Sequence, residues 1–219
     1  MLKNKKNAFT LAEVLLALVI VGIISSLVLP SLLKDMQAKS RMNILKSTLV
    51  GVDDVIHREI AQKRSEDIIN LDIYNNPQSF LDKFNNAVSG TAFATSYQNY
   101  NGTPVNVNIP VSSILLQNGV GVGIINQPEN RCSAVIIDVT GEKPPNTVGI
   151  DYYQAKLFWD EDLANGIHVG DVHGYITTGE DGTESEASYK TSCLNGDPAA
   201  CFRLVELTGY DPDFLDNQY

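Results

Sequence analysis

The chain has little of what most enzymes and metal proteins need. Its 219 residues include only three cysteines and three histidines. The cysteines are too few for a disulfide scaffold, and their spacing fits no zinc motif. The histidines, His57, His168 and His173, are scattered, and the sequence offers no Ser-His-Asp order and no phosphate loop. We therefore expect a protein that is not an enzyme and that uses no metal and no cofactor.

Positive charge is also scarce. Lys and Arg total 16 against 26 Asp and Glu, which gives a formal net charge of −10. An acidic protein repels phosphate backbones, so we expect no nucleic-acid partner. Hydrophobic residues make up 43% of the chain. That share is enough for a packed core and argues against global disorder.

One long segment lacks charge of either sign. This run, Val14–Leu33, has 20 residues, and a bilayer core of about 30 Å takes about 20 apolar residues as a helix. The leader before it, residues 1–8, carries three lysines and no acid. Positive residues stay on the cytoplasmic side. We expect a single-pass protein of the cytoplasmic (inner) membrane with its C-terminal body outside the cytoplasm.

Two ordinary explanations fit this segment less well. A secretory signal has an apolar stretch of about 7–15 residues followed by a cleavage site between small residues. Here the stretch is longer and ends without such a site. A plain membrane anchor explains the length but not Glu13, a carboxylate near the start of the span. Such an acid costs roughly 2.5–3.5 kcal/mol in a bilayer, so it usually has a partner.

The sequence FTLAEVLLALVIVGII, which begins at Phe9, resembles the class III signal of type IV pilins and type II secretion pseudopilins. Phe9 and Glu13 match the first and fifth mature positions of that family, and Pro30 occurs where many pilins have a proline. The family most often has Gly before the cut, whereas this chain has Ala8. The resemblance implies that prepilin peptidase cleaves between Ala8 and Phe9 and N-methylates Phe9. It also implies that Glu13 acts in assembly.

Hydrophobic periodicity predicts that the helix continues beyond the membrane, from Phe9 to about Gln62. Apolar residues recur there at steps of three or four, as one amphipathic stripe: Met42, Leu45, Leu49, Val52, Ile56 and Ile60. We expect residues 9–33 to form the transmembrane and filament-core part and residues 34–62 an amphipathic continuation. Gly22 and Pro30 mark a weak point, because proline lacks an N–H and clashes with the preceding turn. We expect a bend or local melting there in an assembled filament, with a static kink as the alternative for the monomer.

Residues 63–219 are expected to form a β-rich extracytoplasmic domain. A short helix is predicted at Pro77–Val88 with Asn76 as its N-cap, followed by a surface loop at Ser89–Pro104. Alternating or apolar runs predict these strands: Val105–Ile109, Val111–Gln117, Val120–Ile125, Ala134–Val139 and Tyr152–Trp159. The Asn118-Gly119 pair between two of them is a strong hairpin signal.

Residues 138–153 resemble a signature that is common in pseudopilin-like proteins. The matching residues are Asp138, Gly141, Pro145, Asn146, Gly149 and Asp151. Thr140 stands where Asn is usual. The segment 160–190 that follows is acidic and glycine-rich, and pseudopilins sometimes bind calcium in a C-terminal loop. Its carboxylates lack the ordered spacing of a calcium loop, so we expect a solvated loop and no metal ligand.

Cys193 and Cys201 enclose seven residues near the C-terminus. Export to an oxidising compartment permits a disulfide there, and the resemblance favours one, because closing a C-terminal loop is a recurrent pilin feature. Cys132, at the start of an apolar run, is expected to be a buried thiol. The sequence leaves open a bond between Cys132 and either of the other two.

The sequence thus predicts an α+β, pilin-like fold in which a long N-terminal helix packs on an antiparallel sheet. The expected function is structural, as a subunit of a pilin-like filament and first of all a type II secretion pseudopilin. The implied partners are other copies of the chain, other pilin-like subunits, prepilin peptidase and an inner-membrane assembly platform. One alternative is a minor pilin of a type IV pilus, for adhesion or DNA uptake. The other is a membrane-tethered binding module that never polymerises.

Overall fold

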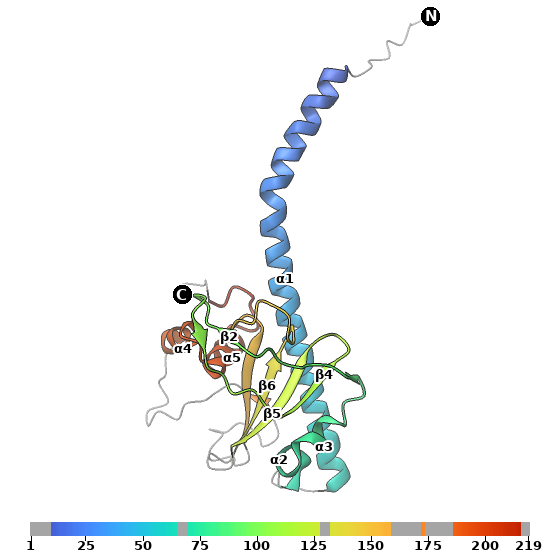
Figure 1. The fold of residues 1–219 in the computed structure, drawn as a ribbon, viewed down its shortest axis with the longest axis vertical. Helices are drawn as coiled ribbons and strands as arrows, with labels where there is room; N and C mark the ends of the chain where they lie inside the picture. The colour runs from blue at the N-terminus through green and yellow to red at the C-terminus, as the bar shows by residue number, and fades with distance from the viewer. Residues whose placement is uncertain (1–9, 65–69, 128–131, 159–171, 174–185, 216–219) are drawn as a thin grey trace, which may run out of the picture.

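One long helix stands out from a mixed body in the computed structural model, which describes residues 10–64, 70–127, 132–158, 172–173 and 186–215 (Figure 1). The N-terminal half of this helix projects away from the body, and its C-terminal half lies against a sheet. The elements follow in this order: α1 (Leu11–Lys63), α2 (Asp72–Asn75), α3 (Pro77–Leu81), β1 (Ala87–Val88), β2 (Tyr97–Gln98), β3 (Pro104–Val105), β4 (Ser112–Leu116), β5 (Gly121–Gln127), β6 (Cys132–Asp138), β7 (Tyr152–Phe158), β8 (Val172–His173), α4 (Glu186–Leu194) and α5 (Pro198–Leu207).

α1 runs unbroken through the proline that was expected to weaken it. Pro30 lies inside the helix, and one turn earlier the Ser26 hydroxyl donates a hydrogen bond of 2.8 Å to the Ile23 carbonyl. Pro30 removes the N–H that would bond the Ser26 carbonyl, so the hydroxyl bond supports the turn before the proline and does not replace the lost bond. Figure 1 shows α1 as continuous and gently curved. The bend or melting expected at Gly22–Pro30 concerns the filament and stays a prediction.

The C-terminal half of α1 is buried along the predicted stripe. All six stripe residues contact the core, and only Ile60 among them is partly rather than fully buried. Thr48, Val55 and Glu59 are buried on the same side. This amphipathic half therefore forms part of the hydrophobic core of the body.

The main sheet has six strands in the order β1-β4-β5-β6-β7-β8, and every pairing in it is antiparallel. β4 and β5 form the predicted hairpin, in which Gly119 has φ 87° and the Leu116 N–H donates to the Val120 carbonyl at 2.8 Å. A left-handed glycine that closes such a short loop is a common hairpin connection. β2 and β3 form a separate pair. The predicted α+β, pilin-like arrangement of a long helix and an antiparallel sheet is confirmed.

The sheet is covered on both faces. Figure 1 shows α1 behind the strands, while the chain between α3 and β4 crosses in front of them. A Cβ added at Gly121 would stand 1.9 Å from the Ala92 carbonyl oxygen, and one at Gly123 would stand 2.1 Å from Pro110 Cγ. These two glycines of β5 therefore let the crossing chain lie directly on the strand.

The surface loop predicted at Ser89–Pro104 is only partly correct: most of its residues are irregular and exposed, but Ala92, Phe93, Ala94 and Tyr97 are buried. Its apolar residues cover the sheet, so that Phe93 is 5% exposed and Tyr97 is 3% exposed. The Tyr152 ring meets both of their rings, with centroids 6.2 Å and 4.5 Å away. Polar composition predicted a solvated loop, but a few aromatic residues decide its position.

The helix predicted at Pro77–Val88 is shorter, because α3 ends at Leu81. It starts as expected, since the Asn76 side chain accepts the Ser79 N–H at 3.2 Å. Beyond the helix, the Lys83 ammonium forms ion pairs with Glu59 of α1 and Asp72 of α2. Ala87 and Val88 then pair with β4 as an edge strand. Tertiary pairing overrides helix propensity here.

The strand predicted at Val105–Ile109 reduces to β3, which ends at Val105. The Asn108 carbonyl accepts a 2.8 Å hydrogen bond from the Tyr152 hydroxyl instead of a strand partner, and Ile109 is 44% exposed. The alternation of valine and asparagine thus reflects a chain lying half-buried on the sheet. The other four predicted strands correspond to β4, β5, β6 and β7, while Trp159 lies outside the described residues.

The sequence reasoning does not predict the two C-terminal helices. Their best signal is the Asp197-Pro198 pair, because the Asp197 carboxylate accepts the N–H groups of Ala199 at 2.9 Å and Ala200 at 3.3 Å. An acid followed by proline is a typical helix start. α5 packs against β7 and is joined to α4, so the C-terminal segment completes the core.

Candidate functional site

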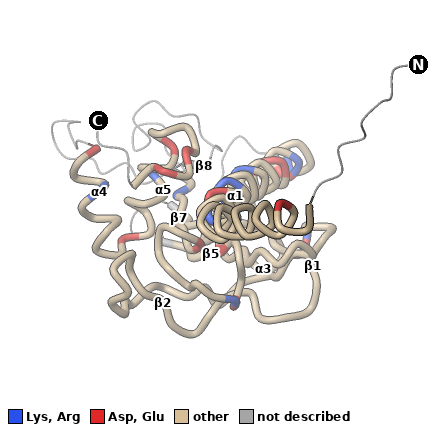
Figure 2. Tube along the Cα trace, turned by 90° about the horizontal axis from the view of Figure 1, so that it is seen from above, with Lys and Arg blue, Asp and Glu red and all other residues tan. Residues whose placement is uncertain are grey.

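The N-terminal half of α1 presents an extended, exposed apolar surface. It contains the stretch that passes the length and hydropathy test for a membrane span, with a mean hydropathy of 2.6 and none of it buried. Leu11, for example, is 81% exposed and Leu27 is 74% exposed. Apart from Glu13 in the first turn, the charged residues of α1 lie along its C-terminal half (Figure 2). An exposed apolar surface of this size requires a partner, either lipid or protein.

Glu13 caps the start of this helix. Its carboxylate accepts the Thr10 N–H at 2.8 Å and the Thr10 hydroxyl at 2.9 Å, while the Glu13 N–H donates back to the Thr10 hydroxyl at 3.3 Å. This reciprocal pair is a capping box. The structure therefore gives Glu13 a local role that the sequence reasoning missed, although the T-x-x-E spacing is its usual signal.

The other predicted processing residues are placed as follows. Ala8 and Phe9 lie outside the described residues, so the cleavage and methylation site stays a prediction. Gly22 lies within α1, and a Cβ added to it would meet nothing within 4 Å. Glu13, Gly22 and Pro30 thus share one helix, each more than two turns from the next.

A cluster of four charges fixes the far end of α1. Glu59, only 1% exposed, lies 2.9 Å from Lys63 Nζ and 3.1 Å from Lys83 Nζ. Asp72 lies 2.6 Å and 2.7 Å from the same two nitrogens, and its backbone N–H donates to Glu59. The two ammonium groups hold the pKa of Asp72 at about 2, below its usual value. Only the Glu59–Lys63 spacing signals this cluster in the sequence.

The signature residues Asp138 and Asp151 close a loop between β6 and β7. Both are fully buried, and burial raises the pKa of Asp138 to about 7 and shifts that of Asp151 in the same direction. The Thr140 hydroxyl lies between them, 3.3 Å from Asp138 Oδ1 and 3.1 Å from Asp151 Oδ2. Threonine in place of the usual asparagine thus bridges the two carboxylates.

Each carboxylate of this loop also has a partner of its own. The Tyr97 hydroxyl donates to Asp138 at 2.6 Å. The N–H groups of Asn146 and Thr147 donate to Asp151 at 2.7 Å and 2.6 Å. These bonds are those of a structural turn, in which buried carboxylates satisfy backbone donors.

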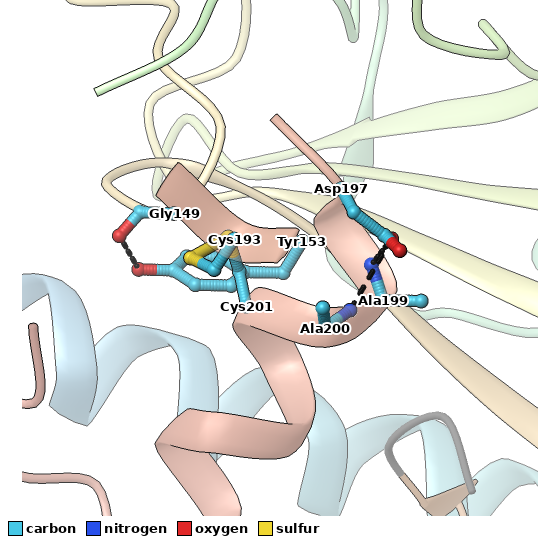
Figure 3. The surroundings of a disulfide bond; sticks show 7 residues. All are labelled: Gly149, Tyr153, Cys193, Asp197, Ala199, Ala200 and Cys201. Carbon is cyan, nitrogen blue, oxygen red and sulfur yellow. Dashed lines mark hydrogen bonds between the residues drawn. A yellow bond between two sulfur atoms is a disulfide. The ribbon is translucent and has the colours of Figure 1, made fainter. Parts of the chain in front are cut away.

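Gly149 connects this loop to the disulfide between Cys193 and Cys201, which has an S–S distance of 2.05 Å (Figure 3). Gly149 has φ 84°, and a Cβ there would stand 2.9 Å from Cys201 Sγ and 3.1 Å from Cys193 Sγ. Its carbonyl accepts a 2.9 Å hydrogen bond from the Tyr153 hydroxyl, next to the sulfur atoms. Only glycine fits this backbone position.

Pairing of these two cysteines leaves neither of them for Cys132, whose side chain lies outside the described residues. Among the residues that the structure describes, no three His, Cys, Asp or Glu side chains are grouped so that they could hold a metal ion. The acidic segment predicted to be a solvated loop lies mostly outside the described ranges, and its described residues form β8 and the start of α4 rather than a loop. His168 and the side chain of His173 also lie outside the described ranges.

Comparison with known proteins identifies the N-terminal segment. A family model described as the prokaryotic N-terminal methylation motif matches residues 3–29. This motif is the class III prepilin signal of type IV pilin-like proteins, and the chain carries it. No curated protein and no solved structure matches the chain. The signal, the apolar half-helix and the α+β body therefore point together to a prepilin-like protein.

Proposed function

We propose that the protein is a structural subunit of a pilin-like filament, in particular a type II secretion pseudopilin, and that it is not an enzyme. The observation that carries this proposal is the exposed apolar half of α1, most of which lies within the methylation motif at residues 3–29. A helix that is apolar all round needs a bilayer or other helices around it. The signature residues of the 138–151 loop favour the pseudopilin within this class.

Processing and assembly follow from the N-terminal residues. Cleavage after Ala8 creates an ammonium group on Phe9, one residue before the helix cap. That cation and the Glu13 carboxylate are both costly in an apolar filament core unless they are paired. When subunits stack, Glu13 of one copy can meet the Phe9 amine of the next. A misplaced subunit would leave a charge unpaired, so this pair sets the axial register.

A membrane-tethered module that does not polymerise is the second candidate, and the capping box favours it. Glu13 satisfies Thr10 within a single chain, so its presence has an explanation without any filament. A test must therefore separate the cap from the charge. Glutamine serves at this position of a capping box as glutamate does, but it carries no charge.

The deciding experiment compares Glu13→Gln with Glu13→Val in the producing bacterium. We expect both variants to insert into the membrane and to be cleaved. We also expect both to lower the yield of sheared filaments, relative to total membrane-bound protein, by roughly tenfold or more, because both remove the charge. A normal yield for Glu13→Gln together with a loss for Glu13→Val would show that Glu13 acts only as a helix cap and not through its charge. Normal yields for both would show that Glu13 has no part in assembly, and absence of the wild-type chain from sheared filaments would favour the tethered module.

Two further observations separate the remaining alternatives. Mass spectrometry of the membrane-extracted protein should find a chain that begins at methylated Phe9, and an intact Met1 in cells that have the peptidase would refute processing. Genes for a secretion ATPase and an outer-membrane secretin next to this gene would favour the pseudopilus over a minor pilin of a type IV pilus.

A further inference from the structure

A cleft of about 340 Å³ opens beside α1 just beyond its apolar half. A volume of this size is within the range of small-molecule sites. Four parts of the chain form its walls: residues 34–42 of α1, Tyr100, residues 145–150 of the signature loop, and residues 212–215 near the C-terminus. The proposed assembly mechanism makes no use of this cleft.

Arg41 faces the cleft without a hydrogen-bond partner. It is partly buried, yet its guanidinium forms no hydrogen bond and no ion pair with any residue in the described ranges. Asp151 is close enough for the charge of Arg41 to lower its pKa, but its two oxygens already accept the N–H groups of Asn146 and Thr147. The fork of N–H donors on Arg41 therefore remains for a ligand. Its planar shape suits a phosphate group.

The position of the cleft along α1 suggests where that phosphate comes from. Lys34 is the first charged residue after the apolar run, and Arg41 follows on the same face about 10 Å further along the helix axis. Helical side chains lean toward the N-terminus, which here means toward the membrane. With residues 14–33 in the hydrocarbon core, both cations therefore reach back to the layer of lipid headgroups.

Among the described residues that line the cleft, the charges are balanced. Asp35 and Asp213 line it together with Lys34 and Arg41, and none of these four side chains has a hydrogen bond or ion pair to another described residue. A ligand with a net negative charge would meet the two carboxylates unfavourably. A zwitterion that carries both a phosphate and an ammonium group satisfies both signs. Met42, Phe214 and Leu215 add an apolar wall for the part of the ligand nearest its acyl chains.

We propose that this cleft binds the headgroup of a phosphatidylethanolamine-type phospholipid, with its phosphate on Arg41 and Lys34 and its ammonium group toward Asp35 and Asp213. The proposal rests on the proposed function in one respect, that α1 crosses a membrane. The lipid would hold the body at a fixed height above the bilayer until the subunit leaves it.

Native mass spectrometry of the purified full chain in detergent tests this proposal, with phosphatidylethanolamine, phosphatidylglycerol and inorganic phosphate as probes. Lys39→Gln is the matched control for Arg41→Gln, because Lys39 lies at nearly the same depth but lines a separate, shallow hollow with Met36 and Asn43. We expect one bound phosphatidylethanolamine, preferred over phosphatidylglycerol about tenfold. Arg41→Gln should weaken its binding about tenfold, and Lys39→Gln should leave it unchanged. Equal effects of the two variants, a preference for phosphatidylglycerol, or equal binding of inorganic phosphate would each overturn the proposal.

Asp213→Asn tests the ammonium side without touching Arg41. It should bring the ratio of phosphatidylethanolamine to phosphatidylglycerol binding close to one, and an unchanged ratio would contradict the assignment. Circular dichroism melting of each variant checks that the body is folded.

Carbonate extraction of cell membranes distinguishes failure of the proposed function from failure of the headgroup site alone. If the wild-type chain is released by carbonate, the proposed function fails. If it is retained and Arg41→Gln binds the lipid normally, only the headgroup site fails.

Discussion

The two halves of α1 are continuous in structure and opposite in environment. Both are rich in large apolar residues, yet Leu45 in the C-terminal half is fully buried while Leu18 in the N-terminal half is 64% exposed. The C-terminal half is amphipathic and finds its partner in the sheet of its own chain. The N-terminal half is apolar on all sides and has no partner within the described part of the chain.

This difference shows that one helix serves two separate purposes. Burial of the C-terminal half contributes to the folding of the body, because apolar area removed from water stabilises the folded state. The N-terminal half contributes nothing to that free energy, since it is exposed whether the body is folded or not. Its apolar surface is available for a bilayer first and for other subunits later.

The largest expected effect comes from shortening one leucine in each half. Leu45→Ala should lower the free energy of unfolding of the body by about 2–5 kcal/mol, because it leaves a cavity in the core. Leu18→Ala, the matched control, should change it by less than about 0.5 kcal/mol. Urea titration of the full chain in detergent, followed by near-ultraviolet circular dichroism, measures both. Similar losses for the two variants would contradict the division of the helix.

The disulfide tests whether the body is stabilised independently of the membrane half. Cys193→Ser should lower the free energy of unfolding by about 2–3 kcal/mol, because the short covalent loop no longer restricts the unfolded chain. Filament-independent steps, insertion and cleavage, should be unaffected. Non-reducing peptide mapping of the wild type should recover Cys193 linked to Cys201, and a bridge to Cys132 would contradict the pairing.

A smaller, pH-dependent effect on the free energy of unfolding is expected from Asp72, whose ion pairs hold the C-terminal end of α1. The pKa of Asp72 is about 2 in the folded protein against an ordinary value of 3.8, so its ion pairs stabilise the fold above about pH 4. That contribution is lost as the pH falls from about 4 toward 2. Asp72→Asn should cost about 1–2 kcal/mol at pH 7 and flatten the acid limb of the stability curve.

The control for this prediction is Asp54→Asn, which removes an exposed ion pair with Arg58 on the same helix. Exposed pairs contribute little, so its stability curve should follow that of the wild type. Acid unfolding curves of all three proteins provide the comparison. An Asp72→Asn curve parallel to the wild type below pH 4 would show that the cluster does not anchor the helix.

The sequence alone predicts the elements that depend on regular patterns. The six-residue stripe of α1, the hairpin at Asn118-Gly119 and four strands follow from periodicity and turn chemistry, which are local. The path of segment 89–109 does not follow from a local pattern, because it depends on contacts with β5, where Gly121 and Gly123 leave room for the segment. No local pattern reports which distant strand will carry those glycines.

The residues of the candidate site also fall into two groups, those whose role the sequence signals and those whose role only the structure shows. Glu13 is visible in the sequence as an isolated acid, and its capping partner lies three residues away. The Glu59 cluster brings together residues from α1, α2 and the turn after α3, so only the folded chain reveals it. The contact of Gly149 with the disulfide likewise joins positions more than forty residues apart. Charges and glycines acquire these roles through tertiary structure.

Photo-crosslinking from the N-terminal half tests the central claim most directly. A benzoylphenylalanine in place of Leu18 lies in the middle of the exposed apolar surface. In cells that have the assembly platform, the account predicts cross-linked dimers of this chain, or cross-links to other pilin-like subunits, after irradiation. In cells that lack the platform it predicts cross-links to lipid alone. Cross-links to lipid alone in both strains would contradict the claim that the N-terminal half of α1 is an assembly surface.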